Sequence, residues 1–333
     1  MSTDATALFL TSDEIADLAD PDEYVDPVRA GYRERGHGAP AKPRTTLFND
    51  APAGMLTGYL AILPETGAMG GYTYAAGFEG RDAHFALPIF DADSGEPLAL
   101  LDGASMNPLK TGAAGAVGLD ALARADATDL AVIGSGTQAR GQVRAAASVR
   151  DLERVEVFSP TQEHREAFAA EMNEALDATV AAVASSAAAV EGADVVVTAT
   201  NASDPVFDGD VLEPGTHVTA MGQYHPAKHE LDTTTIERAT YVPDLRARVT
   251  QDAGSFIHAM EAGAVDEDDV HAELGEVLVG DAPGRASPED ITVFDSGGTA
   301  IETVAAGKML YDRAREAGVG EEIPFAPASS AMD

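Results

Sequence analysis

From residue 130 onward, short apolar runs alternate with helical stretches, and this alternation restricts the possible folds more than any other feature. The apolar runs have the length and branched side chains of buried strands, and they occupy residues 130–133, 155–158, 180–183, 195–199 and 217–221. The segments between them, such as residues 139–149 and 163–176, have helical composition. Strands that alternate with helices form βαβ units, so the sequence predicts an α/β fold with a parallel sheet.

The first hundred residues follow a different pattern, in which strand-like runs are separated by turn residues rather than by helices. These runs are residues 45–48, 55–63, 71–78, 85–91 and 98–101. The turn at residues 93–96 joins the last two as a hairpin, and we expect an antiparallel sheet. Helices are predicted over residues 111–123 and 300–317, and the tail from Pro324 is predicted to be loose.

Charge is the strongest signal in the composition. The 333 residues include 56 acidic and 21 basic ones, which gives a formal net charge of −35, and the acids are spread along the chain. Such self-repulsion opposes compaction at ordinary ionic strength, but it is screened at molar salt, where the Debye length falls to about 3 Å. We therefore expect adaptation to a high-salt cytoplasm, although an acidic protein of an ordinary cytoplasm fits the same counts. Such a surface repels nucleic acid.

Other counts exclude several classes of protein. Without cysteine, the chain has no disulfide framework, no thiolate metal ligand and no cysteine nucleophile. No apolar run reaches the roughly 20 residues of a membrane helix, and the first residues, MSTD, lack the basic start of a signal peptide. No cluster of histidine and acidic residues has metal-ligand spacing. We therefore expect a cytoplasmic protein of two domains, with no metal and no membrane or nucleic-acid partner.

A glycine-rich turn follows the apolar run at residues 130–133. It has the sequence Gly134-Ser135-Gly136-Thr137-Gln138-Ala139, and a helix starts near Gln138. Gly134 permits the tight turn, Gly136 lets the backbone approach a pyrophosphate, and Ala139 keeps the helix close to the strand. The helix N-terminus then meets the phosphate charge. A structural glycine loop is the alternative, but a strand, a turn and a helix in this order predict a dinucleotide site.

The end of the next strand bears on which dinucleotide binds. Proteins that bind NAD usually carry an acidic residue there, about 20 residues after the turn. Here the strand ends in Ser159-Pro160-Thr161 without a carboxylate, and His164 and Arg165 follow. These groups would tolerate a 2′-phosphate, so the sequence slightly favours NADP(H) over NAD(H). The same residues would also serve simply as the start of a helix.

Motifs spread along the whole chain resemble, in the same order, those of the ornithine cyclodeaminase/mu-crystallin family. Residues 93–103 (DSGEPLALLDG) resemble the family's hairpin, and residues 109–114 (LKTGAA) stand where the family has an Arg-Thr-Ala-Ala helix start. The turn at residues 134–139 ends in the Gln-Ala pair typical of the family. Further matches are residues 8–11, 198–201, 221–226 and 230–232 and the closing motif at residues 295–302.

The resemblance implies a Rossmann domain, residues 123–299, inserted in a split α+β substrate and dimerisation domain, residues 1–122 and 300–333. It also implies a homodimer that exchanges hydride between a nicotinamide and the α-carbon of a small imino or amino acid. The family includes cyclodeaminases, alanine dehydrogenases and ketimine reductases, and one member is known chiefly for binding a ligand. The implied cofactor contacts, besides the turn and Ser159, Thr161 and Arg165, are Thr200, Asn201, Met221, Gly222, Ser296 and Gly298.

Three positions match the family's substrate site, and two of them carry a different residue type. Arg44 matches the family's substrate arginine, whose guanidinium binds a carboxylate through two parallel hydrogen bonds. A structural salt bridge of Arg44 fits the spacing equally well. Thr73 stands in place of a lysine, and a threonine cannot act as a cationic anchor. Lys110 stands in place of an arginine. This replacement keeps the positive charge but loses the two parallel hydrogen bonds of a guanidinium. Lys110 would hold either the substrate or the cofactor phosphate.

The expected proton donor is altered as well. Tyr224 stands where several cyclodeaminases and alanine dehydrogenases carry an aspartate, and His225 follows it. Loss of that carboxylate argues against ornithine cyclodeamination, whereas reduction of an imine needs an anchor, a hydride and a proton source. Tyr224 or His225 would donate the proton, and histidine is better matched near neutral pH. For His225 the alternative is a loop histidine bonded to the backbone.

Two hypotheses about function follow from these residues. The first is an NAD(P)-dependent oxidoreductase that reduces or oxidises a small imino, amino or keto acid by hydride transfer. The second is a catalytically altered protein that binds NAD(P)(H) and senses or stores a small ligand. Turnover in the presence of a nicotinamide cofactor distinguishes them.

Overall fold

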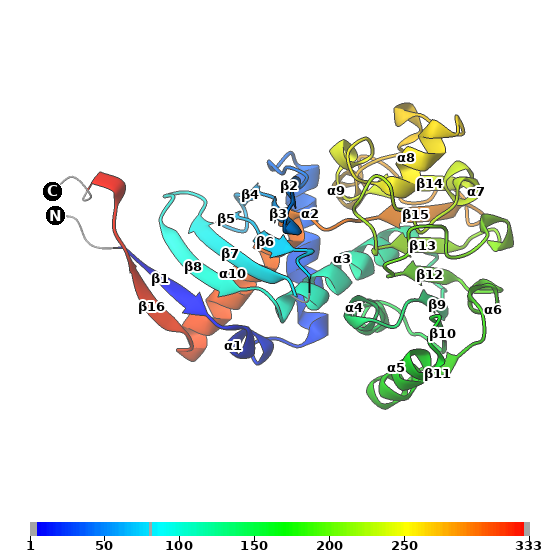
Figure 1. The fold of residues 1–333 in the computed structure, drawn as a ribbon, viewed down its shortest axis with the longest axis horizontal. Coiled ribbons are helices and arrows are strands. Elements are labelled where there is room, and N and C mark those ends of the chain that lie inside the picture. Colours follow the sequence, from blue (N-terminus) through cyan, green and yellow to red (C-terminus); the bar gives the residue numbers. More distant parts are fainter. Residues whose placement is uncertain (1–4, 80–81, 330–333) are drawn as a thin grey trace. The chain divides into compact units, whose positions relative to one another are not determined.

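The computed structural model of the chain describes residues 5–79 and 82–329. These residues form two compact units, one within residues 111–298 and the other combining residues before 111 with residues after 298 (Figure 1). The predicted fold class is confirmed, because a Rossmann-type parallel sheet is inserted between two parts of a mixed α+β unit.

The inserted unit is built on a seven-stranded sheet in which every pairing is parallel. Its strand order is β11-β10-β9-β12-β13-β15-β14. The strands are β9 (Asp129–Ile133), β10 (Arg154–Phe158), β11 (Thr179–Ala182), β12 (Val195–Thr198), β13 (His217–Ala220), β14 (Ala239–Pro243) and β15 (Ile291–Asp295). The five predicted strands are therefore confirmed to within a residue or two at each end, and β14 and β15 were not predicted.

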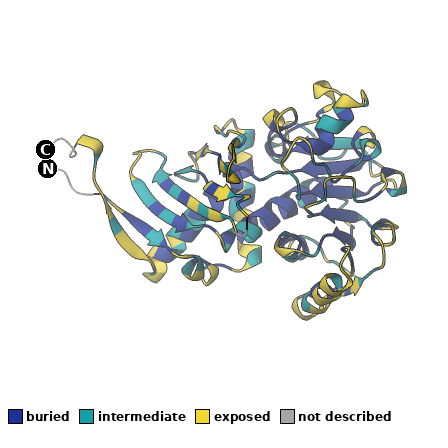
Figure 2. Cartoon of the chain, viewed as in Figure 1, coloured by how far each residue is buried: buried dark blue, intermediate teal, exposed yellow. Residues whose placement is uncertain are grey.

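Side chains of this sheet alternate between two hydrophobic cores. Along β9, Leu130 and Val132 pack into one core, whereas Ala131 and Ile133 pack into the other. Strands covered on both faces lack the polar alternation of a half-exposed strand, which is why they read as continuous apolar runs. Figure 2 shows buried residues along the central strands of this sheet, and β12, β13 and β15 are buried at every position.

The helices of this unit lie between the strands in sequence. They are α4 (Thr137–Ala147), α5 (Gln162–Ala175), α6 (Ser186–Val190), α7 (Thr233–Arg238), α8 (Gly254–Glu261) and α9 (Leu274–Val279), with short 3-10 helices η2 (Gly209–Val211), η3 (Arg246–Arg248) and η4 (Glu267–Asp269). The helix α3 (Met106–Leu122) begins five residues earlier than predicted. Pro108 falls in its first turn, where a helix has no acceptor for the missing N–H in any case.

The other unit is built on a nine-stranded mixed sheet. Its main strand order is β16-β1-β8-β7-β6-β3-β2, and β5 pairs with both β4 and β7. The strands are β1 (Ala5–Leu10), β2 (Thr45–Asp50), β3 (Ala53–Gly58), β4 (Ala61–Leu63), β5 (Ala68–Gly70), β6 (Thr73–Ala76), β7 (His84–Asp91), β8 (Pro97–Asp102) and β16 (Glu321–Phe325). The predicted hairpin of β7 and β8 is confirmed, and the pairing of β1 with β8 is parallel rather than antiparallel.

Two predictions for this unit were wrong. The run at residues 55–63 is two strands, because β3 pairs with β6 whereas β4 turns back to pair with β5. The tail is ordered at its start, since Pro324 and Phe325 belong to β16, which pairs with β1. Residues 330–333 of the predicted loose tail lie outside the described residues.

The helix α10 (Ala300–Ala317) returns the chain to this unit and has the bounds predicted from the sequence. It packs against α2 (Val25–Gly36) and against β4, β5 and β7. The remaining helices are α1 (Ser12–Ala16) and the 3-10 helix η1 (Pro21–Tyr24). The unit is therefore a sheet covered by helices from opposite ends of the sequence.

Candidate functional site

The glycine-rich turn lies at the carboxyl end of β9. Gly134 has a φ of +123°, and a Cβ atom there would lie 2.4 Å from the carbonyl oxygen of Ala199. Its backbone N–H donates to the carbonyl of Phe158 at 2.9 Å. The turn therefore fits tightly between the ends of β10 and β12, and a side chain at Gly134 would push it away.

The next part of the turn has space for a phosphate group. Gly136 is the N-cap of α4, and apart from its chain neighbours no residue has an atom within 4 Å of where its Cβ would be. Thr137 is exposed in the first turn of α4, whereas Ala139 is fully buried and holds the helix against the strand. Unpaired N–H groups at a helix N-terminus favour an anion. These residues fit a dinucleotide phosphate.

A pocket of about 430 Å³ lies beside this turn and gathers the ends of three adjacent strands. Its lining residues are Ile133, Gly134, Phe158, Ser159, Pro160, Thr200, Asn201, Ala202 and Val206. The volume is that of a small-molecule site. The structure thus brings together Gly134, Ser159, Thr200 and Asn201, which the sequence assigned separately to cofactor binding. We refer to it as the nucleotide pocket.

The residues at the tip of β10 contact one another. The hydroxyl of Ser135 donates to the Ser159 hydroxyl at 2.9 Å, and Ser159 is buried. The guanidinium of Arg165 donates to the Ser159 carbonyl at 3.0 Å and stacks 5.7 Å from the centre of the Phe158 ring. Thr161 is the N-cap of α5, and its side chain makes no capping hydrogen bond. Arg165 is thereby held against the polar end of β10.

The loop after β13 carries the two candidate proton donors. Met221 is buried, and its N–H donates to the carbonyl of Thr198 at 2.9 Å. Tyr224 and His225 are exposed on the following loop. Nδ1 of His225 accepts the N–H of Ala227 at 3.1 Å, as in a loop histidine bonded to the backbone. This bond leaves Nε2 as the protonated nitrogen of the neutral ring.

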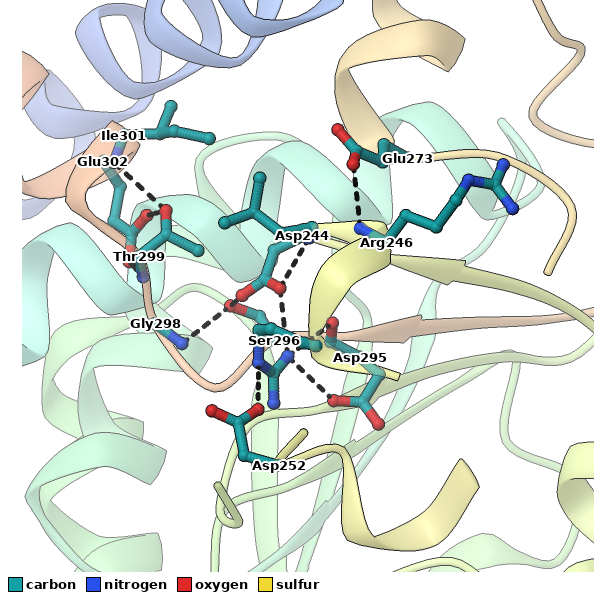
Figure 3. A network of polar contacts seen from close by, with 12 residues as sticks. Asp244, Arg246, Asp252, Glu273, Asp295, Ser296, Gly298, Thr299, Ile301 and Glu302 are labelled. Carbon is teal, nitrogen blue, oxygen red and sulfur yellow. Dashed lines mark hydrogen bonds and ion pairs between the residues drawn. The ribbon is translucent and has the colours of Figure 1, made fainter. Parts of the chain in front are cut away.

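The loop after β15, which contains Ser296 and Gly298, is fixed by a buried charge network (Figure 3). Ser296 donates to a carboxylate oxygen of Asp244 at 2.7 Å, and its own hydroxyl accepts the N–H of Gly298 at 3.2 Å. Arg248 is 1% exposed and contacts three carboxylates. These are Asp252 at 2.6 Å, Asp244 at 3.0 Å and Asp295 at 3.3 Å.

The network holds more negative than positive charge. Three aspartates surround one arginine, and the hydroxyl of Tyr241 donates to Asp295 at 2.8 Å. Burial raises the pKa of Asp295, and the charge of Arg248 opposes this shift. The network positions the backbone of Ser296 and Gly298, which were predicted from the sequence as site residues, whereas Asp244, Arg248 and Asp252 were not.

In the other unit, Arg44 is buried among tyrosines. It is 6% exposed, its Nη1 donates to the hydroxyl of Tyr74 at 3.1 Å, and its guanidinium lies 5.6 Å from the centre of the Tyr59 ring. Thr73 is exposed, whereas Tyr72 and Tyr74 on either side of it are buried. Because side chains alternate along a strand, Thr73 lies on the face of β6 opposite to Tyr74 and its partner Arg44.

Lys110 is also buried in this unit, and its partner is an acidic residue. It is 2% exposed, and its Nζ lies 3.2 Å from a carboxylate oxygen of Glu302. The same carboxylate accepts the N–H of Thr299 at 2.5 Å and the hydroxyl of Tyr32 at 3.2 Å, and thereby caps α10. The ammonium also lies 5.6 Å from the Tyr72 ring and 6.0 Å from the Tyr59 ring. Tyr59 therefore stands beside both Arg44 and Lys110.

Sequence reasoning did not identify Tyr59, Tyr74, Glu230, Arg248 or Glu302 as parts of a site. The tyrosines had a usable signal, since Tyr72 and Tyr74 alternate along a strand that also carries the altered position 73. For Glu230 and Glu302 the available signal was their place in the matched motifs at residues 230–232 and 295–302, but nothing in those motifs showed that the two carboxylates are buried. Within residues 5–79 and 82–329, no group of three or more histidine, cysteine or acidic residues is arranged to hold a metal ion.

No helix in the described part of the chain is long and apolar enough to cross a membrane. Residues 6–318 match the model of a family described as the ornithine cyclodeaminase/mu-crystallin family. The Delta(1)-pyrroline-2-carboxylate reductase of Bacillus cereus is 39% identical over 238 residues, which are 71% of this chain and 73% of that protein.

Two solved structures are similar over nearly the whole chain. The Delta(1)-pyrroline-2-carboxylate reductase of Thermococcus litoralis, in complex with NADH and L-proline, superposes with a TM-score of 0.90 at 30% identity, covering 95% of this chain and 100% of that one. An archaeal alanine dehydrogenase dimer with bound NAD has the same TM-score and identity and covers 96% and 100%.

The pairing of Lys110 with Glu302 predicts a large loss of stability when one partner is removed. We expect Lys110→Met to lower the free energy of unfolding by about 3–5 kcal/mol, because it leaves the Glu302 carboxylate buried without its cation. The double variant Lys110→Met/Glu302→Leu should recover part of this loss. Unfolding in denaturant measures the change. Lys308→Met, in a partly exposed pair with Asp312 on α10, is the control and should cost little. Equal effects of Lys110→Met and Lys308→Met would contradict the assignment.

Proposed function

The chain belongs to the ornithine cyclodeaminase/mu-crystallin family, and on this premise we propose that it reduces a small imino acid to an amino acid. Its activity class is that of an NAD(P)-dependent oxidoreductase that exchanges hydride with a small imino or amino acid. One observation carries the proposal. The tight turn at Gly134 and the open space at Gly136, beside the nucleotide pocket, fit a dinucleotide phosphate. A reductase at 39% identity supports the reducing direction.

We assign residues 123–299 to dinucleotide binding and residues 1–122 with 300–333 to substrate binding and dimerisation. When bound, a reduced nicotinamide supplies the hydride that adds to the imine carbon, and the imine nitrogen gains a proton. Ser135, Thr137 and Gln138, together with the backbone of Gly134 and Gly136, would hold the pyrophosphate. The neighbouring structures contain NADH and NAD, so a nicotinamide cofactor is supported.

Arg44 would hold the substrate carboxylate. A guanidinium binds a carboxylate through two parallel hydrogen bonds, and Tyr74 and Tyr59 restrict the orientation of this one. Thr73 lies on the opposite face of β6 and would make no ionic contact with that carboxylate. Lys110 forms a buried ion pair with Glu302. We therefore propose that Lys110 does not bind substrate but helps to position Arg44 through Tyr59, whose ring both cations approach.

The proton would come from the loop after β13. His225 accepts a backbone N–H at Nδ1, which fixes the tautomer with the proton on Nε2. Both His225 and Tyr224 are exposed and carry donor groups. We propose His225 as the donor because an imidazole is better suited than a phenol to proton transfer near neutral pH. Ornithine cyclodeamination is the less favoured reaction because Tyr224 replaces a carboxylate.

We further propose NADP(H) as the preferred cofactor, a homodimer as the active form and a high-salt cytoplasm as the environment. The tip of β10 offers Ser159, Thr161 and Arg165 and no carboxylate. The dimer is supported by the similar archaeal alanine dehydrogenase, whose structure is a dimer. It is also supported by two apolar side chains on β2, Leu47 and Phe48, which are 65% and 68% exposed. The net charge of −35 supports the high-salt environment.

The role of Arg44 predicts a loss of substrate recognition without a loss of cofactor binding. We expect NADPH-dependent reduction of Δ1-pyrroline-2-carboxylate, or of pyruvate with ammonia, followed as loss of NADPH absorbance. Arg44→Lys should lower kcat/KM by about 10–100-fold, because it removes the two parallel hydrogen bonds of the guanidinium while keeping the charge. The exposed Arg33→Lys is the control and should leave kcat/KM unchanged. Cofactor binding without turnover on these substrates and other small imino acids would overturn the proposal and favour a ligand-binding role.

Arg165 predicts the choice of dinucleotide. Arg165→Ala should weaken NADPH binding about tenfold, because the contact with a 2′-phosphate is a charge-assisted hydrogen bond. Binding of NADH, which lacks that phosphate, should change less than about twofold. Fluorescence titration with each nucleotide measures both constants. Equal weakening of NADPH and NADH, or a wild-type preference for NADH, would contradict the assignment to NADP(H).

Salt should control both stability and association. In about 1 M KCl, where the Debye length is about 3 Å, we expect sedimentation at twice the chain mass. In about 0.1 M KCl, where that length is about 10 Å, repulsion between two chains of charge −35 should favour monomers and lower the free energy of unfolding. A monomer at every salt concentration would contradict the dimer. Stability that does not depend on salt would contradict the high-salt adaptation.

A further inference from the structure

Glu230 is a buried carboxylate between the strand ends that form the nucleotide pocket. It is 2% exposed and lies in the loop between β13 and α7. Its two oxygens accept hydrogen bonds from the N–H of Thr200 at 2.7 Å, the N–H of Gly222 at 2.8 Å and the hydroxyl of Thr198 at 3.0 Å. One side chain therefore binds the ends of both β12 and β13.

The fit of this carboxylate leaves no room for another side chain. A Cβ atom on Gly222 would lie 2.5 Å from both carboxylate oxygens of Glu230 and 2.5 Å from the backbone nitrogen of Thr200. The two loops also meet through Gln223, whose amide donates to the carbonyl of Thr200 at 2.9 Å. Position 222 must be glycine for the backbone to reach Glu230.

The residues that Glu230 holds form one wall of the nucleotide pocket. Thr200, Asn201 and Ala202 line it, and the hydroxyl of Thr200 in turn accepts the N–H of Ala202 at 3.1 Å. On the other side, Gly134 packs against the carbonyl of Ala199. A shift of Thr200 would therefore move both the wall of the pocket and the support of the glycine-rich turn.

The carboxylate is held by dipoles rather than by a cation. Among residues 5–79 and 82–329, no lysine, arginine or histidine forms an ion pair with Glu230. Burial raises the pKa of Glu230, and its hydrogen bonds with Thr200, Gly222 and Thr198 oppose the shift. Hydrogen bonds to an ionised acceptor are shorter and stronger than those to a neutral one. A charged group at this position fixes two backbone N–H groups more firmly than a neutral side chain would.

We propose that Glu230 is the positioning residue that fixes the Thr200–Ala202 wall for the nucleotide, a role that rests on the proposed cofactor binding. Glu230 is buried and is not among the residues that line the pocket, so it would act through Thr200 and Gly222. The wall is thereby in place before the nucleotide arrives, which lowers the cost of ordering it on binding.

The test replaces the charge while keeping the shape. Glu230→Gln puts an amide NH₂ in place of one oxygen, so at least one of the three donors loses its acceptor. We expect the Kd for the nucleotide, measured by fluorescence titration with NADPH and NADH, to rise about tenfold, the effect of losing one hydrogen bond to a charged group. KM for the nucleotide should rise with it, while kcat at saturating nucleotide changes less than about threefold.

A second readout needs no nucleotide. Hydrogen exchange of the backbone amide at Thr200 or at Gly222 should become faster in Glu230→Gln, because the two N–H groups bond to different carboxylate oxygens and glutamine keeps only one of them. Glu230→Asp, which keeps the charge and shortens the reach, should give an intermediate result. If Glu230→Gln fails to fold, Glu230→Asp alone carries the test and should show weaker nucleotide binding and faster exchange at Thr200 or Gly222 than wild type.

A matched control exists at the opposite edge of the same sheet. Asp194, just before β12, accepts the N–H of Thr128 at 2.9 Å and the N–H of Asp129 at 3.1 Å, and unlike Glu230 it also pairs with an arginine, Arg124. Asp194→Asn should lower the free energy of unfolding as Glu230→Gln does, because both remove a charged acceptor of backbone N–H groups. It should leave the nucleotide Kd within about twofold of wild type and should not speed exchange at Thr200.

The outcomes separate this inference from the proposed function. If the wild-type chain binds neither NADPH nor NADH, the proposed function fails. If it binds them and Glu230→Gln binds equally well, the positioning role is overturned and the proposed function stands. Unchanged exchange at Thr200 and Gly222 would overturn the role whether or not nucleotide binds. An equal loss of affinity in Asp194→Asn would reduce the effect of Glu230 to general stability and would also overturn it.

Discussion

Parallel pairing of β9 with β10 on one side and with β12 on the other brings the glycine-rich turn, the polar tip of β10 and Thr200 to one edge of a sheet. In a parallel sheet all strands end at the same edge, and ligands bind where the chain leaves the central strand in opposite directions. The nucleotide pocket lies at this point. Parallel pairing of β12 with β13 and of β13 with β15 brings the loops after β13 and β15 to the same edge, so every candidate cofactor contact depends on the parallel order of this sheet.

The loops at that edge are fixed by buried charges in addition to apolar packing. Glu230 joins the ends of β12 and β13, and Arg248 with Asp244 and two other aspartates holds the loop after β15. In the other unit, Glu302 caps α10 and pairs with Lys110. Directional bonds to a charged group orient a loop, which non-directional apolar contacts do not do. In a chain of charge −35, these few acids are distinguished by burial rather than by residue type.

The surroundings of the altered substrate positions show what contacts each of them can make. Thr73, in place of a lysine, is exposed on the face of β6 opposite to the partner of Arg44, and Lys110 is bound to Glu302. The remaining cation, Arg44, is oriented by Tyr59 and Tyr74. Under the proposed function, Arg44 would be the carboxylate anchor and the exposed His225 the proton donor. These two groups are what imine reduction needs and fewer than cyclodeamination needs.

The sequence alone determined the parallel sheet, five of its strands, the turn at Gly134 and the bounds of α10, because apolar periodicity and glycine position are local properties of the chain. It could not determine that β16 pairs with β1, that residues 55–63 form two strands, or that Glu230, Arg248 and Glu302 are buried. These features depend on partners distant in the sequence, such as Thr198 for Glu230 and Lys110 for Glu302. A carboxylate carries no local sign of burial, since the donors that stabilise it are brought near only when the chain folds.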